Sequence, residues 1–159
     1  MRVGNGYDIH RFDADGTLRL GGIDLPDAPQ LEGHSDGDAL IHAIVDALLG
    51  AAGEGDIGSH FPPGEPETAG IDSRELLTRV ARLIASRGYR VHNIDATVIA
   101  ERPHLAPHVA AMRDSIARSL AIEPAAVNVK ATTNEGLGAI GAGEALAAIA
   151  VVLLDEDVT

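Results

Sequence analysis

The N-terminal half of the chain alternates between strand-like and helix-like patterns of apolar residues. Val3–His10 and Thr17–Leu20 are predicted to be strands, joined by a Gly- and Asp-rich turn at Asp13–Gly16. Apolar residues at helical spacing predict a helix over Ala39–Ala52, which the preceding Asp36–Gly37–Asp38 turn can cap. A Gly- and Pro-rich loop follows at residues 53–66. It is too long for a simple connector, so we expect it to be mobile or functional.

The C-terminal half continues with alternating helices and strands. Asp72 and the residues after it open a second helix, which Gly88 ends. Val91–Ala100 has the pattern of a strand, Pro107–Leu120 that of a third helix, and Val127–Thr132 that of another strand.

The last apolar segment, Glu144–Leu154, fits two kinds of element. Its alanines favour a helix, whereas its β-branched residues favour a buried strand. The order of the elements indicates an α+β fold with one sheet and helices packed on a face of it. Because no linker or internal repeat divides the chain, we expect a single domain over residues 1–159.

Composition excludes several classes of protein. The chain has no Cys, which excludes a disulfide framework and thiolate chemistry. With 12 Lys and Arg against 24 Asp and Glu, its net charge of −12 repels phosphate backbones, so we expect no nucleic-acid partner. The longest apolar run is about half of the ~20 residues that a bilayer demands, and charged residues interrupt the N-terminus where a signal peptide would be apolar. We therefore expect no membrane association and a cytoplasmic location.

A carboxylate and two imidazoles form the first candidate site. Asp8 and His10 leave the same face of a predicted strand, and His42 lies on a predicted helix with Asp46 one turn later, where a carboxylate can orient the imidazole. Each alone also fits a commoner structural role, namely a polar strand end or a half-buried core histidine. Together Asp8, His10 and His42 make an O/N/N donor set for zinc with an open fourth position, or for ferrous iron.

Two further segments can bind hydroxyls or phosphates. Asp56 can hold substrate hydroxyls while the Gly58 backbone approaches closely, although Asp-x-Gly is also a common turn. Thr132 and Thr133 can donate to phosphate oxygens, and Glu135 can take a divalent ion shared with them, although the same residues fit an ordinary turn after a strand. The remaining histidines have no spacing that links them into a site: His60, His92, His104 and His108.

The motifs that surround these residues occur in a fixed order along the chain. They are G-Y-D-I-H, L-G-G-I, H-S-D-G-D-A-L-I-H with D-A-L-L-G-A-A, G-D-I-G-S-H-F-P, D-S-R-E-L-L, N-V-K-A-T-T-N-E and G-x-G-E. In this order, and over nearly the whole chain, they resemble the 2-C-methyl-D-erythritol 2,4-cyclodiphosphate synthases of the non-mevalonate isoprenoid pathway. The resemblance implies a mixed four-stranded sheet, with helices on one face and a short N-terminal hairpin, assembled as a homotrimer.

The resemblance also implies a reaction and its site. Members of this family cyclise 4-diphosphocytidyl-2-C-methyl-D-erythritol 2-phosphate and release CMP. By resemblance, Asp8, His10 and His42 hold a zinc ion, Glu135 is the one protein ligand of a Mg²⁺ or Mn²⁺ ion that bridges the phosphates, and His34 and Thr133 stabilise the transition state. The implied substrate contacts are Asp8, His10, His34, Ser35, Asp56, Ile57, Gly58, Phe61, Ala100, Glu101, Arg102, Pro103, His104, Leu105, Ala106, Ala131, Thr132, Thr133 and Glu135.

In the resembled family the active sites lie between subunits, with the metal ligands on one chain and the cytidine pocket on its neighbour. This chain departs from the family at His104, where a lysine is common, and Arg102 can take over that phosphate contact. It also has Ala139 and Ala142 where many members carry Phe and Arg. The resemblance therefore implies weak or absent binding of isoprenoid diphosphates on the trimer axis, because the bidentate diphosphate clamp is missing.

Two other functions fit parts of the pattern. A ferrous-iron oxygenase uses two histidines and one carboxylate, but its usual order is H-x-D with a distant His in a β-barrel, and this chain has too few strands. A metal-stabilised trimeric module could bind cytidine phosphates without turnover. The argument against this function is the presence of His34, Thr133 and Glu135.

Overall fold

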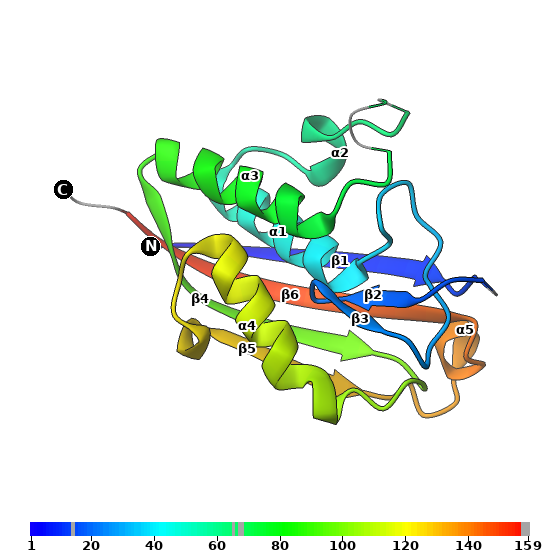
Figure 1. The fold of residues 1–159 in the computed structure, drawn as a ribbon. Helices are drawn as coiled ribbons and strands as arrows, with labels where there is room; N and C mark the ends of the chain where they lie inside the picture. The colour runs from blue at the N-terminus through cyan, green and yellow to red at the C-terminus, as the bar shows by residue number, and fades with distance from the viewer. Residues whose placement is uncertain (14, 65, 67–68, 157–159) are drawn as a thin grey trace.

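A computed structural model describes residues 1–159 except 14, 65, 67–68 and 157–159. Its main sheet has four strands in the order β1-β6-β4-β5 (Figure 1). These strands are β1 (Arg2–Arg11), β4 (Tyr89–Ile99), β5 (Val127–Thr132) and β6 (Ala145–Glu156). Because β4 and β5 are parallel while β6 runs antiparallel to both β1 and β4, the sheet is mixed, as expected.

Three long helices lie over one face of this sheet (Figure 1). They are α1 (Ala39–Ala52), α3 (Ser73–Ser86) and α4 (Val109–Leu120). Helix α1 packs against β1 and β6, α4 packs against β5, and α3 lies against both helices. The short elements are α2 (Ile57–His60), α5 (Gly138–Gly141) and 3₁₀ turns at Ala106–His108 and Pro124–Ala126. The α+β class predicted from the sequence is confirmed.

The structure shows which strands form the short N-terminal hairpin. The segment Val3–His10 does not pair with Thr17–Leu20, because β1 pairs along its whole length with β6. The hairpin consists instead of β2 (Leu18–Leu20) and β3 (Ile23–Leu25), a strand that the sequence pattern did not reveal. The predicted turn at Asp13–Gly16 includes residue 14, which lies outside the described residues.

Other expectations are settled by the described elements. The ambiguous segment Glu144–Leu154 forms the strand β6, which is buried between β1 and β4. The predicted helix Pro107–Leu120 is a 3₁₀ turn followed by α4, which begins at Val109. The Gly- and Pro-rich loop contains α2, and its residue 65 lies outside the described part.

Helix α1 lies directly on the backbone of β1. A side chain at Gly4 would overlap the carbonyl oxygen of Ala47, and one at Gly6 would overlap that of Ala43. Neither glycine has a positive φ, so the backbone conformation does not require glycine there. The close approach of α1 to β1 does. This contact brings the buried face of α1 next to the residues that follow Gly6 on β1, which include Asp8 and His10.

The buried carboxylate of Asp38 fixes the start of α1. It is fully buried and caps the helix by accepting the N–H of Ile41 at 3.0 Å. It also accepts the N–H of Gly21 at 2.9 Å and that of Gly22 at 2.6 Å, in the turn of the β2–β3 hairpin. Burial raises the pKa of Asp38, although the three amide hydrogen bonds oppose that shift. The hairpin is thereby tied to the end of α1 that precedes His42.

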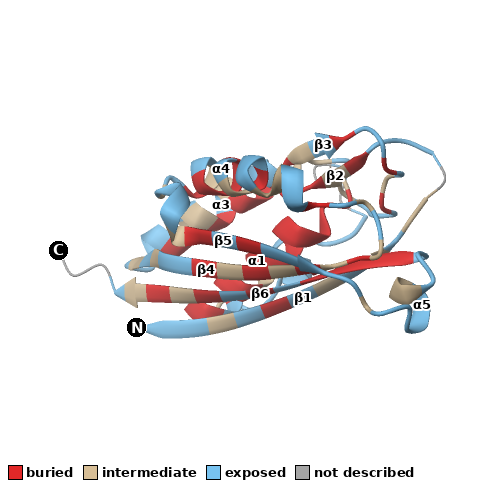
Figure 2. Ribbon diagram, turned by 90° about the horizontal axis from the view of Figure 1, so that it is seen from below, coloured by how far each residue is buried: buried red, intermediate tan, exposed pale blue. Residues whose placement is uncertain are grey.

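The face of the sheet away from the helices is apolar near β1 and β6. Buried and exposed residues alternate along the strands (Figure 2). The exposed set on this face includes Val3 (67% exposed), Tyr7 (54%) and Ile9 on β1, with Ile149 and Val151 on β6. An apolar patch of this kind on a sheet is typical of an interaction surface. In the described part of the chain, no helix is long and apolar enough to cross a membrane.

The contact at Gly6 can be tested by adding one methyl group. Gly6→Ala is expected to push α1 away from β1 and lower the free energy of unfolding by about 1–3 kcal/mol, the usual cost of overpacking. Gly50→Ala on the same helix is the control, because its added Cβ meets nothing closer than 4.0 Å. That control should raise stability by about 0.5–1 kcal/mol through helix propensity. Equal effects of the two substitutions in chemical denaturation would contradict the close contact.

Candidate metal centre and substrate pockets

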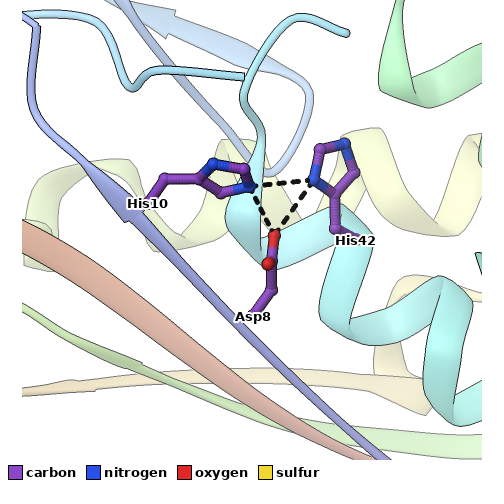
Figure 3. A group of neighbouring side chains, drawn as sticks. All are labelled: Asp8, His10 and His42. Carbon is purple, nitrogen blue, oxygen red and sulfur yellow. Dashed lines mark hydrogen bonds and ion pairs between the residues drawn. The ribbon is translucent and has the colours of Figure 1, made fainter. Parts of the chain in front are cut away.

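Asp8 and His10 of β1 meet His42 of α1 where the helix packs on the strand (Figure 3). His10 Nε2 lies 2.7 Å and His42 Nδ1 lies 3.0 Å from Asp8 Oδ2, and the two imidazole nitrogens are 3.3 Å apart. One ligand atom from each residue lies within 4.8 Å of the others. The alternation of β1 brings Asp8 and His10 to the helix-covered face, and the first turns of α1 bring His42 above them.

The three side chains are strongly coupled electrostatically. Burial alone would raise the pKa of Asp8, but hydrogen bonds from His10 and His42, together with their charges, hold it well below its usual range. The hydrogen bond to Asp8 raises the pKa of His10, against the opposing effect of burial. The carboxylate is therefore ionised and both imidazoles direct a nitrogen toward it.

This donor set fits a divalent transition metal. One carboxylate oxygen and two imidazole nitrogens, all half-buried or buried, are ligands that zinc accepts with a fourth position left for water or substrate. The same set also suits ferrous iron, so the geometry indicates a candidate metal site without naming the ion.

The other ring nitrogen of His42 faces two serines. His42 Nε2 lies 2.9 Å from Ser35 Oγ and 3.0 Å from Ser73 Oγ. Asp46, predicted to orient this imidazole, instead accepts the N–H of Ile57 at 2.8 Å and so fixes the start of α2. The sequence pattern gave no sign of Ser73, because its contact with His42 joins residues 31 positions apart.

A pocket of about 250 Å³ opens over the metal ligands. Its predicted members include His34, whose Nε2 accepts the N–H of Gly64 at 3.0 Å, and Phe61. Its lining consists of Asp8, His10, His34, Ser35, His42, Asp46, Ile57, Gly58, Phe61, Pro63, Ile71 and Leu76. One cavity is therefore surrounded by seven of the predicted substrate contacts: Asp8, His10, His34, Ser35, Ile57, Gly58 and Phe61.

Asp56 is placed at the edge of this region. Its carboxylate caps α2 by accepting the backbone N–H of Ser59 at 2.8 Å and its hydroxyl at 2.7 Å. These hydrogen bonds lower the pKa of Asp56. Ile57 and Gly58 line the pocket and Asp56 does not, so in this structure its carboxylate serves the turn.

The predicted cytidine and phosphate contacts form a second, separate pocket. It has a volume of about 210 Å³ and is lined by Ala100, Glu101, Pro103, His104, Leu105, Ala106, Ala131, Thr132 and Thr133. Arg102 is not part of this lining. It lies in an adjoining cavity of about 800 Å³, which also includes His104 and Ala142.

Glu101 organises the loop that carries Glu135. One oxygen of its carboxylate accepts the N–H of Asn134 at 2.9 Å and that of Gly136 at 3.3 Å. These bonds flank Glu135, which has a φ of 52°, an uncommon left-handed backbone for a residue with a side chain. The Thr133 hydroxyl donates to the Glu135 carboxylate at 3.2 Å, so the two side chains share one site.

The two pockets lie at the same end of the sheet but at opposite edges. β1, β4 and β5 run in the same direction, so His10, Ala100 and Thr132 all lie near the ends at which their strands finish. However, β1 and β5 are the two outer strands of the order β1-β6-β4-β5. Three strand spacings of about 4.8 Å therefore separate the two edges.

Comparison with known proteins places the chain in a family. The profile of the YgbB family matches residues 1–155. The chain belongs to the YgbB family. Proteins named 2-C-methyl-D-erythritol 2,4-cyclodiphosphate synthase are similar over nearly the full length. That of Trichlorobacter lovleyi is 55% identical, covering 97% of this chain and 98% of the relative, and that of Thermosynechococcus vestitus is 57% identical, covering 97% and 96%. The resemblance drawn from the sequence motifs is confirmed.

Solved structures with related sequences share the fold. The bifunctional IspDF from Campylobacter jejuni matches 98% of this chain, and 42% of its own, with a TM-score of 0.94 and 39% identity. A CDP complex of IspF from Plasmodium falciparum matches 99% of this chain and 97% of its own, with a TM-score of 0.87 and 36% identity. This chain therefore shares its fold with proteins that differ from it at more than half of the aligned residues.

The coupling of His10 to Asp8 predicts a pH dependence of metal binding. Protons and metal compete for His10 Nε2, and the pKa of this imidazole is raised above the ordinary 6.5. As the pH is lowered, zinc affinity should therefore begin to fall above pH 6.5 and then decrease by about tenfold per pH unit. Competition with a chromophoric chelator across this range measures the affinity.

Asp8→Asn is the matched comparison for this pH profile. It replaces the charged acceptor that raises the pKa of His10 with a neutral amide, so the fall should begin at lower pH, although the overall affinity is weaker. Identical profiles for the two proteins would show that Asp8 does not control the protonation of His10.

Proposed function

We propose that this chain converts 4-diphosphocytidyl-2-C-methyl-D-erythritol 2-phosphate into 2-C-methyl-D-erythritol 2,4-cyclodiphosphate and CMP. The observation that carries the proposal is the Asp8, His10 and His42 cluster inside a pocket, in a chain about 55% identical over nearly its full length to proteins named for this synthesis. The substrate carries both the nucleophile and the electrophile, and this determines what the protein has to contribute.

The reaction needs positioning more than acid–base chemistry. A non-bridging oxygen of the 2-phosphate attacks the β-phosphorus, the bond from that phosphorus to the bridging oxygen breaks, and the electron pair leaves with CMP. Because a phosphate oxygen is already ionised at neutral pH, the protein supplies no base, and catalysis rests on orientation and on neutralising charge. Zinc at the Asp8, His10 and His42 cluster would supply Lewis-acid polarisation of the phosphates.

The chain's own residues divide into two groups. His34 and Ser35, in the pocket over the metal ligands, would hold the methylerythritol phosphate end. Thr132 and Thr133 would donate hydroxyl hydrogen bonds to the diphosphate, and Glu135 beside them would hold a Mg²⁺ or Mn²⁺ ion that the phosphates share. Local donors and ions are required because the net charge of −12 cannot attract an anionic substrate.

A homotrimer would bring these two groups together. The pockets lie at one end of the sheet and at opposite edges, so a ring in which β5 of one subunit approaches β1 of the next completes a site at every junction. In such a ring the apolar face around Tyr7 and Ile149 would be buried toward the axis. Both features support the trimer, which would therefore be required for activity.

Phosphorus NMR of the purified protein with substrate, zinc and magnesium tests the reaction. Signals of the cyclic diphosphate and of CMP should appear, and His42→Ala should slow their appearance on the order of 10²-fold or more, because it removes a metal ligand. His92→Ala, which changes an exposed imidazole paired with Asp155, is the matched control and should retain the rate. Intact substrate with a folded, zinc-loaded protein would overturn the synthase proposal, and CMP binding without turnover would indicate the binding module.

The shared site is tested by mixing subunits. Asp8→Asn and Glu135→Gln should each abolish activity, but a co-expressed mixture should regain about a quarter of the wild-type sites, because each mixed trimer has one junction with both halves intact. A mixture of Asp8→Asn with His42→Ala, both defective in the same half, is the control and should stay inactive. Without recovery in the first mixture, the proposal of a site between subunits fails.

A further inference from the structure

His42 is held from the side opposite the metal cluster by a buried hydroxyl. Ser73 is the first residue of α3 and is 1% exposed, and its Oγ lies 3.0 Å from His42 Nε2. The same hydroxyl donates a short hydrogen bond to Asp36 Oδ1, and the backbone N–H of Ser73 donates to Asp36 Oδ2 at 2.8 Å. None of the contacts that define the metal cluster uses Ser73 or Asp36.

The direction of these hydrogen bonds follows from donor and acceptor counting. A carboxylate only accepts, so the single hydroxyl hydrogen of Ser73 points to Asp36. Toward His42 the Ser73 oxygen can then only accept, so this contact requires a hydrogen on His42 Nε2. In the metal-free protein Asp8 Oδ2, 3.0 Å from Nδ1, competes as the acceptor for the ring hydrogen, and a metal ion on Nδ1 would remove that competition. A neutral imidazole with hydrogen on Nε2 has its lone pair on Nδ1, the nitrogen that faces Asp8 and His10.

We propose that Asp36 and Ser73 are positioning residues that hold His42 in the Nε2–H tautomer, with its Nδ1 lone pair directed at the metal. This inference deepens the proposed function and rests on its metal site. In general, the second ring nitrogen of a metal-binding histidine donates to a fixed acceptor. Here that acceptor is a hydroxyl, which a carboxylate holds in place.

Asp36 is itself fixed from several sides. Its Oδ2 lies 3.5 Å from Arg19 Nε, and its Oδ1 accepts the N–H of Asp38 at 3.2 Å. Arg19 also binds Asp72, the residue that caps α3, through a contact of 2.8 Å. The acceptor for Ser73 is therefore held between the start of α3 and the β2 strand, and has little freedom to turn away.

Ser35 offers a competing contact with the same nitrogen. Its Oγ lies 2.9 Å from His42 Nε2, but among the described residues the structure gives it no carboxylate acceptor. Its hydrogen can therefore point either toward His42 or into the pocket, so Ser35 does not determine the tautomer. With His42 held by Ser73, the Ser35 hydroxyl is left to donate into the pocket.

The tautomer is measured by ¹⁵N NMR of histidine-labelled, metal-free protein at a pH where His42 is neutral. Ser73 and Asp8 compete for the ring hydrogen, so the wild type should carry a larger share of hydrogen on Nε2 than Ser73→Ala, in which the population should shift toward hydrogen on Nδ1 with Asp8 as the acceptor. Ser86→Ala, at the exposed end of the same helix, is the matched control and should leave the tautomer unchanged. An unchanged tautomer in a folded Ser73→Ala protein would overturn the proposal.

Zinc affinity gives the second readout, by competition with a chelator. Ser73→Ala should weaken binding by about 10–100-fold, as loss of such outer partners does, whereas Ser86→Ala and Ser35→Ala should stay within a few-fold of the wild type. Ser73→Thr keeps the hydroxyl and should restore most of the affinity. If Ser73→Ala does not fold, Asp36→Asn removes the charge at nearly constant volume, and it should also weaken zinc binding and loosen the tautomer.

The outcomes separate the two proposals. Loss of affinity in Ser35→Ala and not in Ser73→Ala would assign the positioning role to Ser35 and overturn ours. If the wild type binds no zinc, the proposed metal site fails, and the metal-free tautomer still decides whether Asp36 and Ser73 orient His42.

Discussion

The absence of side chains at Gly4 and Gly6 determines how the rest of the site is built. It allows α1 to rest on the backbone of β1, so that a histidine on the helix reaches a carboxylate and a histidine on the strand within 3.0–3.3 Å. Any larger residue at Gly6 would meet the Ala43 carbonyl, and protein interiors do not deform enough to absorb such an overlap without moving the helix. Metal ligation tolerates only small errors in position, so the spacing of two backbones becomes a condition for binding an ion.

A polar network at the opposite end of this contact fixes the rotation of α1 and the ring of His42. Asp38 ties the helix start to the β2–β3 hairpin, while Asp36 and Arg19 tie the same loop to the start of α3. Buried or half-buried carboxylates are costly unless each oxygen finds donors, and here backbone amides and the Ser73 hydroxyl provide them, while Arg19 supplies a positive charge 3.5 Å from Asp36. The H-S-D-G-D segment therefore serves both as a wall of the pocket and as the anchor of the helix that carries His42.

Short-range patterns predicted the parts of this structure that depend on neighbouring residues. The alternation of β1 placed Asp8 and His10 on one face, and Asp38 and Asp72 were recognisable as helix caps. The pairing of β1 with β6 could not be read in this way, because register between strands at the two ends of the chain is set by packing. Neighbouring positions likewise suggested that Asp46, one helical turn away, orients His42. In the structure Asp46 binds Ile57 instead, and the hydroxyl that contacts the imidazole from α3 belongs to Ser73.

The separation of the two pockets has a consequence for how an acidic protein handles an anionic substrate. With a charge of −12, the chain gains nothing from long-range attraction, so binding depends on donors placed at short distance. Those donors lie at opposite edges of one sheet, and its uncovered face is apolar beside β1 but carries the Asp95–Lys130 ion pair beside β5. The proposed assembly, which joins unlike edges, would therefore bring the hydroxyls and Glu135 of one chain to Asp8, His10 and His42 of another. Burial of the apolar face would stabilise the same arrangement, so that one geometry would account for both the assembly and the completed site.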